Sequence, residues 1–178
     1  VMNRNDITFP FKRYQIQPVW RADKPQKGRY REFFQCDADI VGTDSLVCEA
    51  ELLAMVQEVY KCFAFDAYSI SISNRKILEG IAEVCGAKEE FSRFCVILDK
   101  LDKIGKEKVF NELALLGLNK QSLHRLDQIL ALSGNNVEKL DALLSLLNES
   151  EIGQKGIAET RETLDNLSLL GFLTDKVL

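Results

Sequence analysis

The stretch from Lys12 to Gly42, KRYQIQPVWRADKPQKGRYREFFQCDADIVG, predicts a β-hairpin. Residues 14–23 and 30–41 are rich in aromatic and β-branched side chains and alternate in polarity, as half-buried strands do. Between them, residues 24–28 read KPQKG, and Pro and Gly favour a tight turn. Because a short turn joins antiparallel neighbours, we expect two antiparallel strands.

Successive side chains of a strand point to opposite faces of the sheet, so each strand has an even-numbered and an odd-numbered face. We expect the even-numbered face to pack in the core, with Cys36 as a small core residue rather than a nucleophile. The residues of this face are Tyr14, Ile16, Pro18, Trp20, Phe34, Cys36, Ala38 and Ile40.

The odd-numbered face is polar. If odd positions pair with odd positions, Arg21 shares this face with Gln35, Asp37 and Asp39. Carboxylates in mid-strand are costly to bury without partners, so this face should meet a polar ligand or a salt-bridge network. An antiparallel sheet with one face exposed to water is the alternative interpretation.

The hairpin is also strongly basic within an acidic chain. Between Lys12 and Arg31 there are seven basic residues and one acid, Asp23, whereas the whole chain of 178 residues has a net charge of -4. A local cluster of positive charge favours an anionic partner.

The order of residues in the hairpin resembles motif 2 of class II aminoacyl-tRNA synthetases, in the form typical of the histidyl-tRNA synthetase family. Arg21, Asp23 and Phe33 meet the general class II signature. The longer run PQKGRYREF at 25–33, with QCD at 35–37 and DIVG at 39–42, is similar to the histidine enzymes rather than to their threonine, proline or glycine relatives. SNRKILEG at 73–80 adds a second, weaker match, and Asp23 stands where the family usually has Glu.

This resemblance implies an ATP site. It places Arg21 at the α-phosphate of ATP and at the amino acid carboxylate, where a guanidinium would stabilise the charge of the transition state, so Arg21 is the expected catalytic residue. Arg29 would hold the γ-phosphate with its planar fork, Phe33 would stack on adenine, and Asp23 would lie near the adenine amino group.

The resemblance also implies a histidine site. Arg21 would meet the carboxylate, Gln35 the α-amino group and Asp39 the imidazole, while Asp37 is interpreted as structural. A buried ring N–H left unpaired costs about 1 to 3 kcal/mol, so an acceptor such as Asp39 would discriminate against apolar amino acids. The implied partners are histidine, ATP with Mg²⁺, tRNA(His) and a second subunit of a homodimer. We expect no metal-binding side chains.

Members of the family run to more than twice this length. The chain begins without motif 1, ends before motif 3, and lacks the histidine-specific segment, which reads roughly RGLDYYTG, and the anticodon-binding domain. We therefore interpret it as a fragment and expect that the isolated chain does not form histidyl-adenylate.

The predicted fold class is α+β. Residues 1–86 are expected to form a partial class II antiparallel sheet with flanking helices, and residues 87–178 an all-helical insertion domain. A helix is predicted over 43–65, with Thr43, Asp44 and Ser45 as capping candidates, then a strand over 68–73 and a helix over 75–85. Leu spacing, Gly and Asn predict further helices over 88–104, 106–116, 120–132, 137–147 and 151–170.

Two other functional classes stay open. One is a non-catalytic synthetase paralogue, acting as a regulatory subunit or a tRNA-sensing domain. The other is an RNA or protein interaction module in residues 87–178; the resemblance places this part near the tRNA acceptor arm. These residues hold twelve Lys and Arg against fifteen Asp and Glu, so their charges favour a solvated surface over an RNA site.

Cysteine usage and hydropathy indicate the compartment. The five Cys are odd in number and form no CxxC pair, which favours a reducing compartment and argues against a disulfide scaffold or a zinc site. No signal peptide or membrane-spanning run is visible. We expect a cytoplasmic protein with no membrane association.

Overall fold

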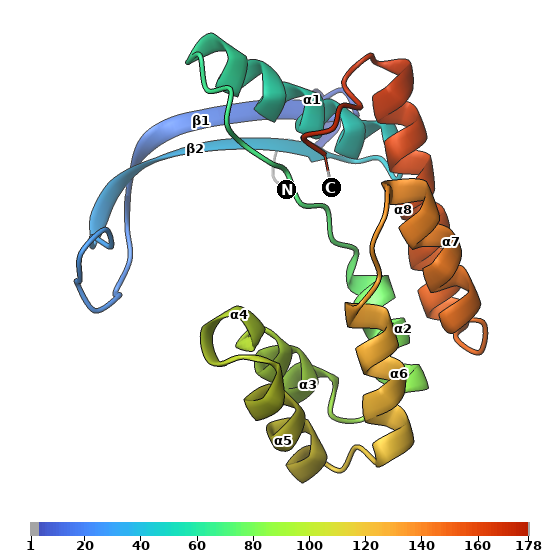
Figure 1. Cartoon of the computed structure of the whole chain (residues 1–178). Coiled ribbons are helices and arrows are strands. Elements are labelled where there is room, and N and C mark those ends of the chain that lie inside the picture. The colour runs from blue at the N-terminus through green and yellow to red at the C-terminus, as the bar shows by residue number, and fades with distance from the viewer. Residues whose placement is uncertain (1–3, 178) are drawn as a thin grey trace.

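The computed structural model describes residues 4–177 and places a long hairpin beside a group of helices (Figure 1). In chain order the elements are η1 (Arg4–Asp6), β1 (Phe11–Trp20), β2 (Glu32–Val41), α1 (Val47–Cys62), α2 (Arg75–Val84), α3 (Phe91–Leu98), α4 (Leu101–Ile104), α5 (Lys106–Leu116), α6 (Lys120–Leu130), α7 (Asn136–Leu146) and α8 (Glu151–Leu169).

The predicted hairpin is confirmed. β1 and β2 pair antiparallel, from Phe11 opposite Val41 to Trp20 opposite Glu32, so odd positions do pair with odd positions. At the tip, the Gln26 and Arg29 backbones exchange N–H···O bonds of 3.1 and 2.9 Å around Lys27 and Gly28. Gly28 has φ +77°, a left-handed conformation that glycine adopts without steric cost.

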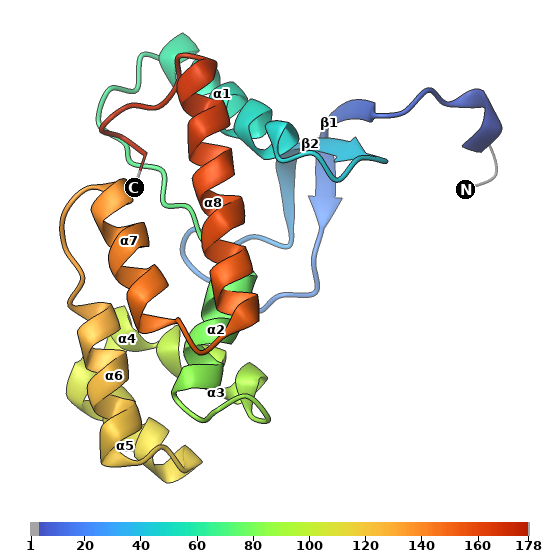
Figure 2. The ribbon, with the colours of Figure 1, turned by 90° about the vertical axis from the view of Figure 1, so that its right-hand side faces the viewer.

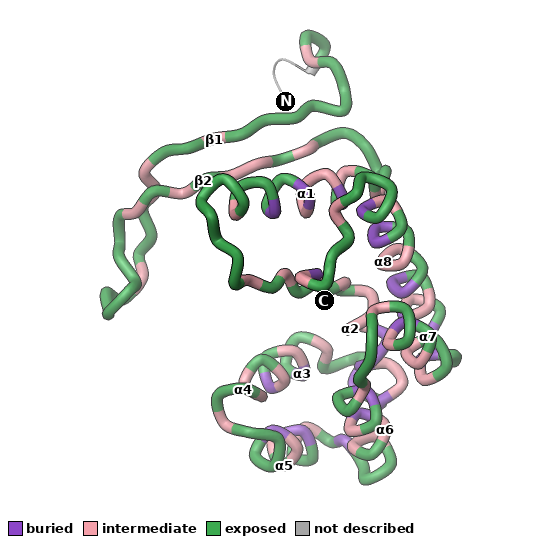
Figure 3. Tube along the Cα trace, turned by 45° about the horizontal axis from the view of Figure 1, so that its top comes forward, coloured by how far each residue is buried: buried purple, intermediate pink, exposed green. Residues whose placement is uncertain are grey.

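The expectation that the even-numbered face packs in the core is wrong for the described residues. Tyr14 is 79% exposed and Phe34 73% exposed, and Cys36 is exposed too. Figure 3 shows no buried residue along either strand. A sheet face becomes core only when another element covers it, and residues 4–177 leave this face open.

The segments after the hairpin follow the predicted order with two corrections. α1 begins after Leu46, and no side chain caps it; instead the Ser45 N–H donates to Thr43 Oγ1 at 3.1 Å. Residues 68–73 form no strand, because their only bridge within residues 4–177 joins Ile70 to Val177, in parallel. An extended segment becomes a strand only with a continuous ladder to a partner, which the described chain does not supply.

The helical half contains one break that the sequence did not predict. The single helix expected over 88–104 is divided into α3 and α4, because the Lys100 N–H bonds to the Ile97 carbonyl in a tighter turn. α5 to α8 lie within two residues of their predicted bounds. Side chains of Asn119, Asn135 and Ser150 accept N–H bonds at the starts of α6, α7 and α8.

The long helix α8 returns to the first part of the chain and packs against both α1 and α2 (Figure 2). The contact with α2 is close, because a Cβ built on Gly80 would lie 2.5 Å from the Cα of Gly153. Below it the core continues among α3, α5 and α6 through buried Phe94, Leu113 and Leu126. The division between residues 86 and 87 into two domains stays a prediction.

The end of the described chain is tied to α1. The buried Gln57 donates from Nε2 to the Phe172 carbonyl at 2.9 Å, and its Oε1 accepts from the Thr174 hydroxyl at 3.4 Å. Both polar atoms of this buried amide are therefore satisfied.

None of the helices within residues 4–177 is both long enough and apolar enough to cross a membrane.

Candidate functional site

Three predicted site residues meet on the odd-numbered face of the hairpin. Arg21 follows β1 directly, and its Nη2 donates to Oε1 of Gln35 on β2 at 2.9 Å. The same guanidinium lies over the Phe33 ring, with its central carbon 5.1 Å from the ring centroid. Because Gln35 and Phe33 both come from β2, the antiparallel register is what brings them beside Arg21.

The contacts around Arg21 restrict where its guanidinium can point. One edge is bound to an amide oxygen and one face rests on an aromatic ring, an arrangement to which a planar cation is well suited. The residue is otherwise exposed, so its remaining N–H groups are open to a ligand. An exposed, oriented guanidinium can bind a carboxylate or a phosphate through two parallel bonds.

The predicted ATP residues of the loop pair with each other. Arg29 Nη2 lies 3.0 Å from Asp23 Oδ2, and its Nε donates to the same oxygen at 3.1 Å. The Arg29 side chain is 56% exposed and that of Asp23 34% exposed. An ion pair this exposed contributes about 0 to 1 kcal/mol, so an incoming anion can replace Asp23 as the partner of Arg29 at little cost.

Asp39 lies apart from this group, because it is four positions beyond Gln35 along β2. Its cross-strand neighbour is Arg13, and Arg13 Nε is 3.3 Å from Asp39 Oδ2. Arg13 also donates to Gln15. Sequence reasoning does not identify Arg13 as a site residue, because alternation places it on the odd-numbered face but only the exact register sets it opposite Asp39.

Asp37, which the sequence predicts to be structural, contacts Gln35 of the predicted histidine site. Its Oδ1 accepts a hydrogen bond of 2.5 Å from Gln35 Nε2. Arg21, Gln35 and Asp37 thus form one hydrogen-bonded series along the face of the hairpin. Cross-strand from Asp37 lies Gln15, and no ion pair with Asp37 is present in residues 4–177.

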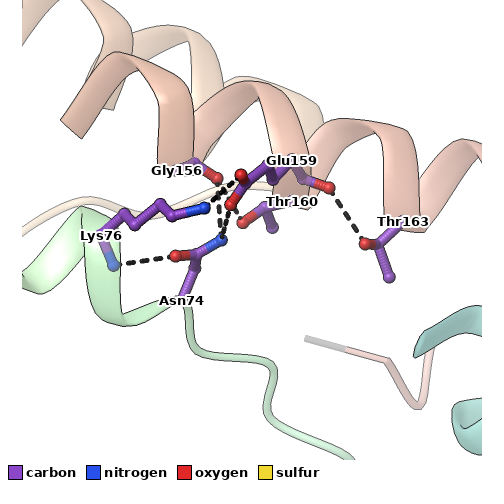
Figure 4. Close-up of polar contacts among 6 residues, drawn as sticks. All are labelled: Asn74, Lys76, Gly156, Glu159, Thr160 and Thr163. Carbon is purple, nitrogen blue, oxygen red and sulfur yellow. Dashed lines mark hydrogen bonds and ion pairs between the residues drawn. The ribbon is translucent and has the colours of Figure 1, made fainter. Parts of the chain in front are cut away.

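The second sequence match, at 73–80, lies away from the hairpin at the contact between α2 and α8 (Figure 4). Asn74 caps α2 through the Lys76 N–H at 2.8 Å and donates to the Gly156 carbonyl at 3.3 Å. Lys76 pairs with Glu159 of α8, and this contact lowers the pKa of the Glu159 carboxyl. A charged cleft beside this cluster is lined by Arg75, Lys76, Lys155 and Glu159, among others.

No group of three or more His, Cys, Asp or Glu side chains in residues 4–177 is arranged to hold a metal ion. The acids of the odd-numbered face, Asp23, Asp37 and Asp39, are instead spaced along it and engaged singly by Arg29, Gln35 and Arg13. The described side chains therefore do not fit a protein-bound Mg²⁺ site of their own, since such a site needs several oxygen ligands around one point.

Comparison of the sequence with known proteins points to one family. The sequence model described as "Histidyl-tRNA synthetase" matches residues 4–173. Histidine–tRNA ligase of Cytophaga hutchinsonii is 54% identical over 173 residues, which are 96% of this chain and 38% of that protein. Histidine–tRNA ligase of Bacteroides fragilis is 53% identical over 171 residues, or 96% of this chain and 37% of that protein. This chain thus spans under two fifths of the length of these relatives.

Solved structures agree on the fold. The crystal structure of histidyl-tRNA synthetase from Nostoc sp. PCC 7120 superposes with a TM-score of 0.88 at 31% identity, covering 99% of this chain and 41% of that one. An ATP phosphoribosyltransferase regulatory subunit/histidyl-tRNA synthetase from Bacillus halodurans C superposes at 0.78 over 97% of this chain and 43% of that one, with 18% identity, which supports the fold alone. The expected α+β class, a partial class II sheet with flanking helices, is confirmed. With the family model covering almost all of its residues, the chain belongs to the histidyl-tRNA synthetase family.

Proposed function

We propose that this chain supplies the ATP- and histidine-binding hairpin of a histidine–tRNA ligase, an enzyme that activates histidine with ATP and transfers it to tRNA(His). The observation that carries the proposal is the position of Arg21, which is oriented by Gln35 and Phe33 and still exposed to a ligand. Family membership and the 54% identity to the Cytophaga hutchinsonii ligase support the same reaction.

In the proposed reaction, the histidine carboxylate attacks the α-phosphorus of ATP and pyrophosphate leaves. Arg21 binds the α-phosphate and the carboxylate, where negative charge accumulates. Because its contacts with Gln35 and Phe33 hold the guanidinium in place before the substrates arrive, little reorganisation is needed in the transition state. Loss of one such donor lowers a rate by about 100-fold to 1000-fold.

The other hairpin residues bind the rest of the two substrates. Arg29 exchanges Asp23 for the γ-phosphate, and Phe33 presents its ring to adenine while Asp23 meets the adenine amino group. Asp39 accepts from the imidazole of histidine. Mg²⁺ is proposed to arrive bound to the phosphates of ATP.

The reaction is proposed to need more than residues 1–178, because the related ligases are more than twice as long. The complete natural protein that contains this chain is proposed to act as a homodimer in the cytoplasm, with the helical residues 87–178 near the acceptor arm of tRNA(His). The isolated chain is proposed to be inactive, and pyrophosphate exchange well above background by residues 1–178 alone would contradict that part.

Histidine-dependent ATP/pyrophosphate exchange by the complete protein tests the function. Exchange stimulated by histidine and by no other amino acid is the expected result. Arg21→Ala should lower the exchange rate by about 100-fold or more with the urea unfolding midpoint unchanged. Arg93→Ala is the matched control, since Arg93 is exposed and, within residues 4–177, pairs only with Glu90 one turn away.

The alternative is a non-catalytic paralogue that serves as a regulatory subunit. The Bacillus halodurans protein, whose name combines both descriptions, has the same fold at 18% identity. A folded complete protein with no exchange for any amino acid would favour this alternative. Near-normal exchange by Arg21→Ala would instead reject the α-phosphate role while leaving the ligase in place.

A further inference from the structure

We propose that Asp37 is a positioning residue that fixes the orientation of the Gln35 amide, so that Gln35 Oε1 faces Arg21 and the amino acid ammonium group. The inference rests on the proposed histidine site and adds to it a residue that the resemblance did not assign. It begins from two hydrogen bonds, Gln35 Nε2 to Asp37 Oδ1 at 2.5 Å and Arg21 Nη2 to Gln35 Oε1 at 2.9 Å.

The chemistry of the two neighbours permits one amide orientation. A guanidinium only donates hydrogen bonds, and an ionised carboxylate only accepts them. A flipped Gln35 would place its NH₂ against the donors of Arg21 and its oxygen against the carboxylate of Asp37, so both hydrogen bonds would be lost together. Removing either neighbour leaves the amide with a single constraint.

The orientation matters because the α-amino group of histidine is an ammonium ion and needs an acceptor. Gln35 can bind it only through Oε1. In the observed arrangement that oxygen lies 2.9 Å from Arg21 Nη2, so an acceptor for an ammonium and a donor for a carboxylate stand side by side. These are the two charged groups that every free α-amino acid carries on one carbon.

The environment of Asp37 supports a role in orienting Gln35. The two other hairpin acids on this face each have a basic partner, Asp23 with Arg29 and Asp39 with Arg13. Asp37 is half-buried and has no ion pair within residues 4–177. A partly buried carboxylate without a basic partner is costly unless hydrogen bonds or a bound cation compensate it. Gln35 Nε2 supplies that hydrogen bond, so the Asp37 carboxylate is held against the amide that it orients.

The test measures histidine and ATP KM values separately in the exchange reaction of the complete protein. Asp37→Ala should raise the histidine KM by roughly 10-fold to 100-fold, the range for loss of one hydrogen bond to a charged group, with the ATP KM within about twofold. Asp37→Asn keeps an acceptor oxygen for Gln35 Nε2 and should rescue much of this loss. Glu58→Ala is the control, because it removes an exposed carboxylate of α1 whose single ion-pair partner in the described part of the chain is Lys61.

A double-mutant cycle separates positioning from a merely structural role. If Asp37 acts through Gln35, Asp37→Ala should add little to the rise in histidine KM already caused by Gln35→Ala. Additive effects, or equal rises in the KM of histidine and of ATP, would overturn the inference even if the protein proves to be the proposed ligase. If Asp37→Ala does not fold, Asp37→Asn provides the test. A histidine KM of Asp37→Asn as high as that of Gln35→Ala would overturn the inference, which requires the Asn oxygen to restore the contact with Gln35.

The exchange activity of the unmodified protein shows whether the proposed function fails or only the role of Asp37. No histidine-dependent exchange by the folded, unmodified protein would overturn the proposed function and the role of Asp37 together. Histidine-dependent exchange with an Asp37→Ala histidine KM equal to that of the unmodified protein would overturn the role of Asp37 alone.

Discussion

Gly80→Ala should destabilise the protein, although alanine is the better helix former. Gly80 lies inside α2, where replacing Gly by Ala favours the helix by about 0.5 to 1 kcal/mol. Against this, the added Cβ would lie 2.5 Å from the Cα and 3.0 Å from the N of Gly153 in α8. These are backbone atoms and cannot rotate away, so the two helices must separate.

The magnitude follows from the difference between these two effects. Overpacking a close contact costs about 1 to 3 kcal/mol, and a contact with rigid backbone belongs at the upper end of that range. After subtraction of the gain in helix propensity, the expected net loss in the free energy of unfolding is about 1 to 2 kcal/mol. For a chain of this size, that corresponds to a fall in Tm of roughly 2 to 8 °C.

Urea unfolding followed by circular dichroism measures the loss, with two companion variants. Gly153→Ala should cost less than Gly80→Ala, because its Cβ would lie 3.1 Å from a side-chain methyl of Leu147 and 3.2 Å from the Cα of Gly80, contacts that need a shift of only a few tenths of an ångström. Ala158→Gly on the exposed face of α8 measures helix propensity alone and should cost about 1 kcal/mol. A Gly80→Ala protein as stable as the unmodified one would refute the close packing of α2 against α8.

Three further predictions concern thiols, pH and the hairpin loop. Burial raises the pKa of the Cys85 thiol to about 11, so at pH 8 Ellman's reagent should modify the exposed Cys36 rapidly and Cys85 only after unfolding; equal rates would contradict the buried position. The Lys76 contact lowers the pKa of Glu159 below 4.5, so this carboxylate stabilises the fold above pH 4.5 and loses that contribution as the pH falls through the folded-state pKa. The loss of stability caused by Lys76→Met should therefore shrink below pH 4.5 in urea titrations, and a pH-independent loss would exclude the ion pair as its cause. Arg29→Ala should raise the ATP KM of the complete protein without lowering the free energy of unfolding by more than about 1 kcal/mol, because its pair with Asp23 is exposed; an unchanged ATP KM would reject the phosphate role.

Much of the candidate site could be predicted from the order of residues, because it lies on a hairpin. Alternation assigned Arg21, Gln35, Asp37 and Asp39 to one face, and the register confirms that odd positions pair with odd positions. The roles of these residues came from resemblance to a family and remain proposals. What alternation could not supply was the partner of each side chain: Arg13 for Asp39, and Asp37 for Gln35.

The sequence by itself determined the local structure of this protein. The turn at Gly28, the helix caps at Asn119, Asn135 and Ser150, and the bounds of α5 to α8 all follow from interactions between residues close together in the chain. Such interactions depend on side-chain type and spacing, which can be read directly from the amino-acid sequence.

The tertiary structure alone decided which faces are covered and which extended segments pair. The apolar face of the hairpin bearing Tyr14 and Phe34 is exposed, residues 68–73 form a single bridge rather than a strand, and α8 packs on α2 through Gly80 and Gly153. Each outcome depends on a partner far away in the sequence. Periodicity shows that a face is apolar or a segment extended, but burial and strand pairing arise only when another part of the chain lies against it.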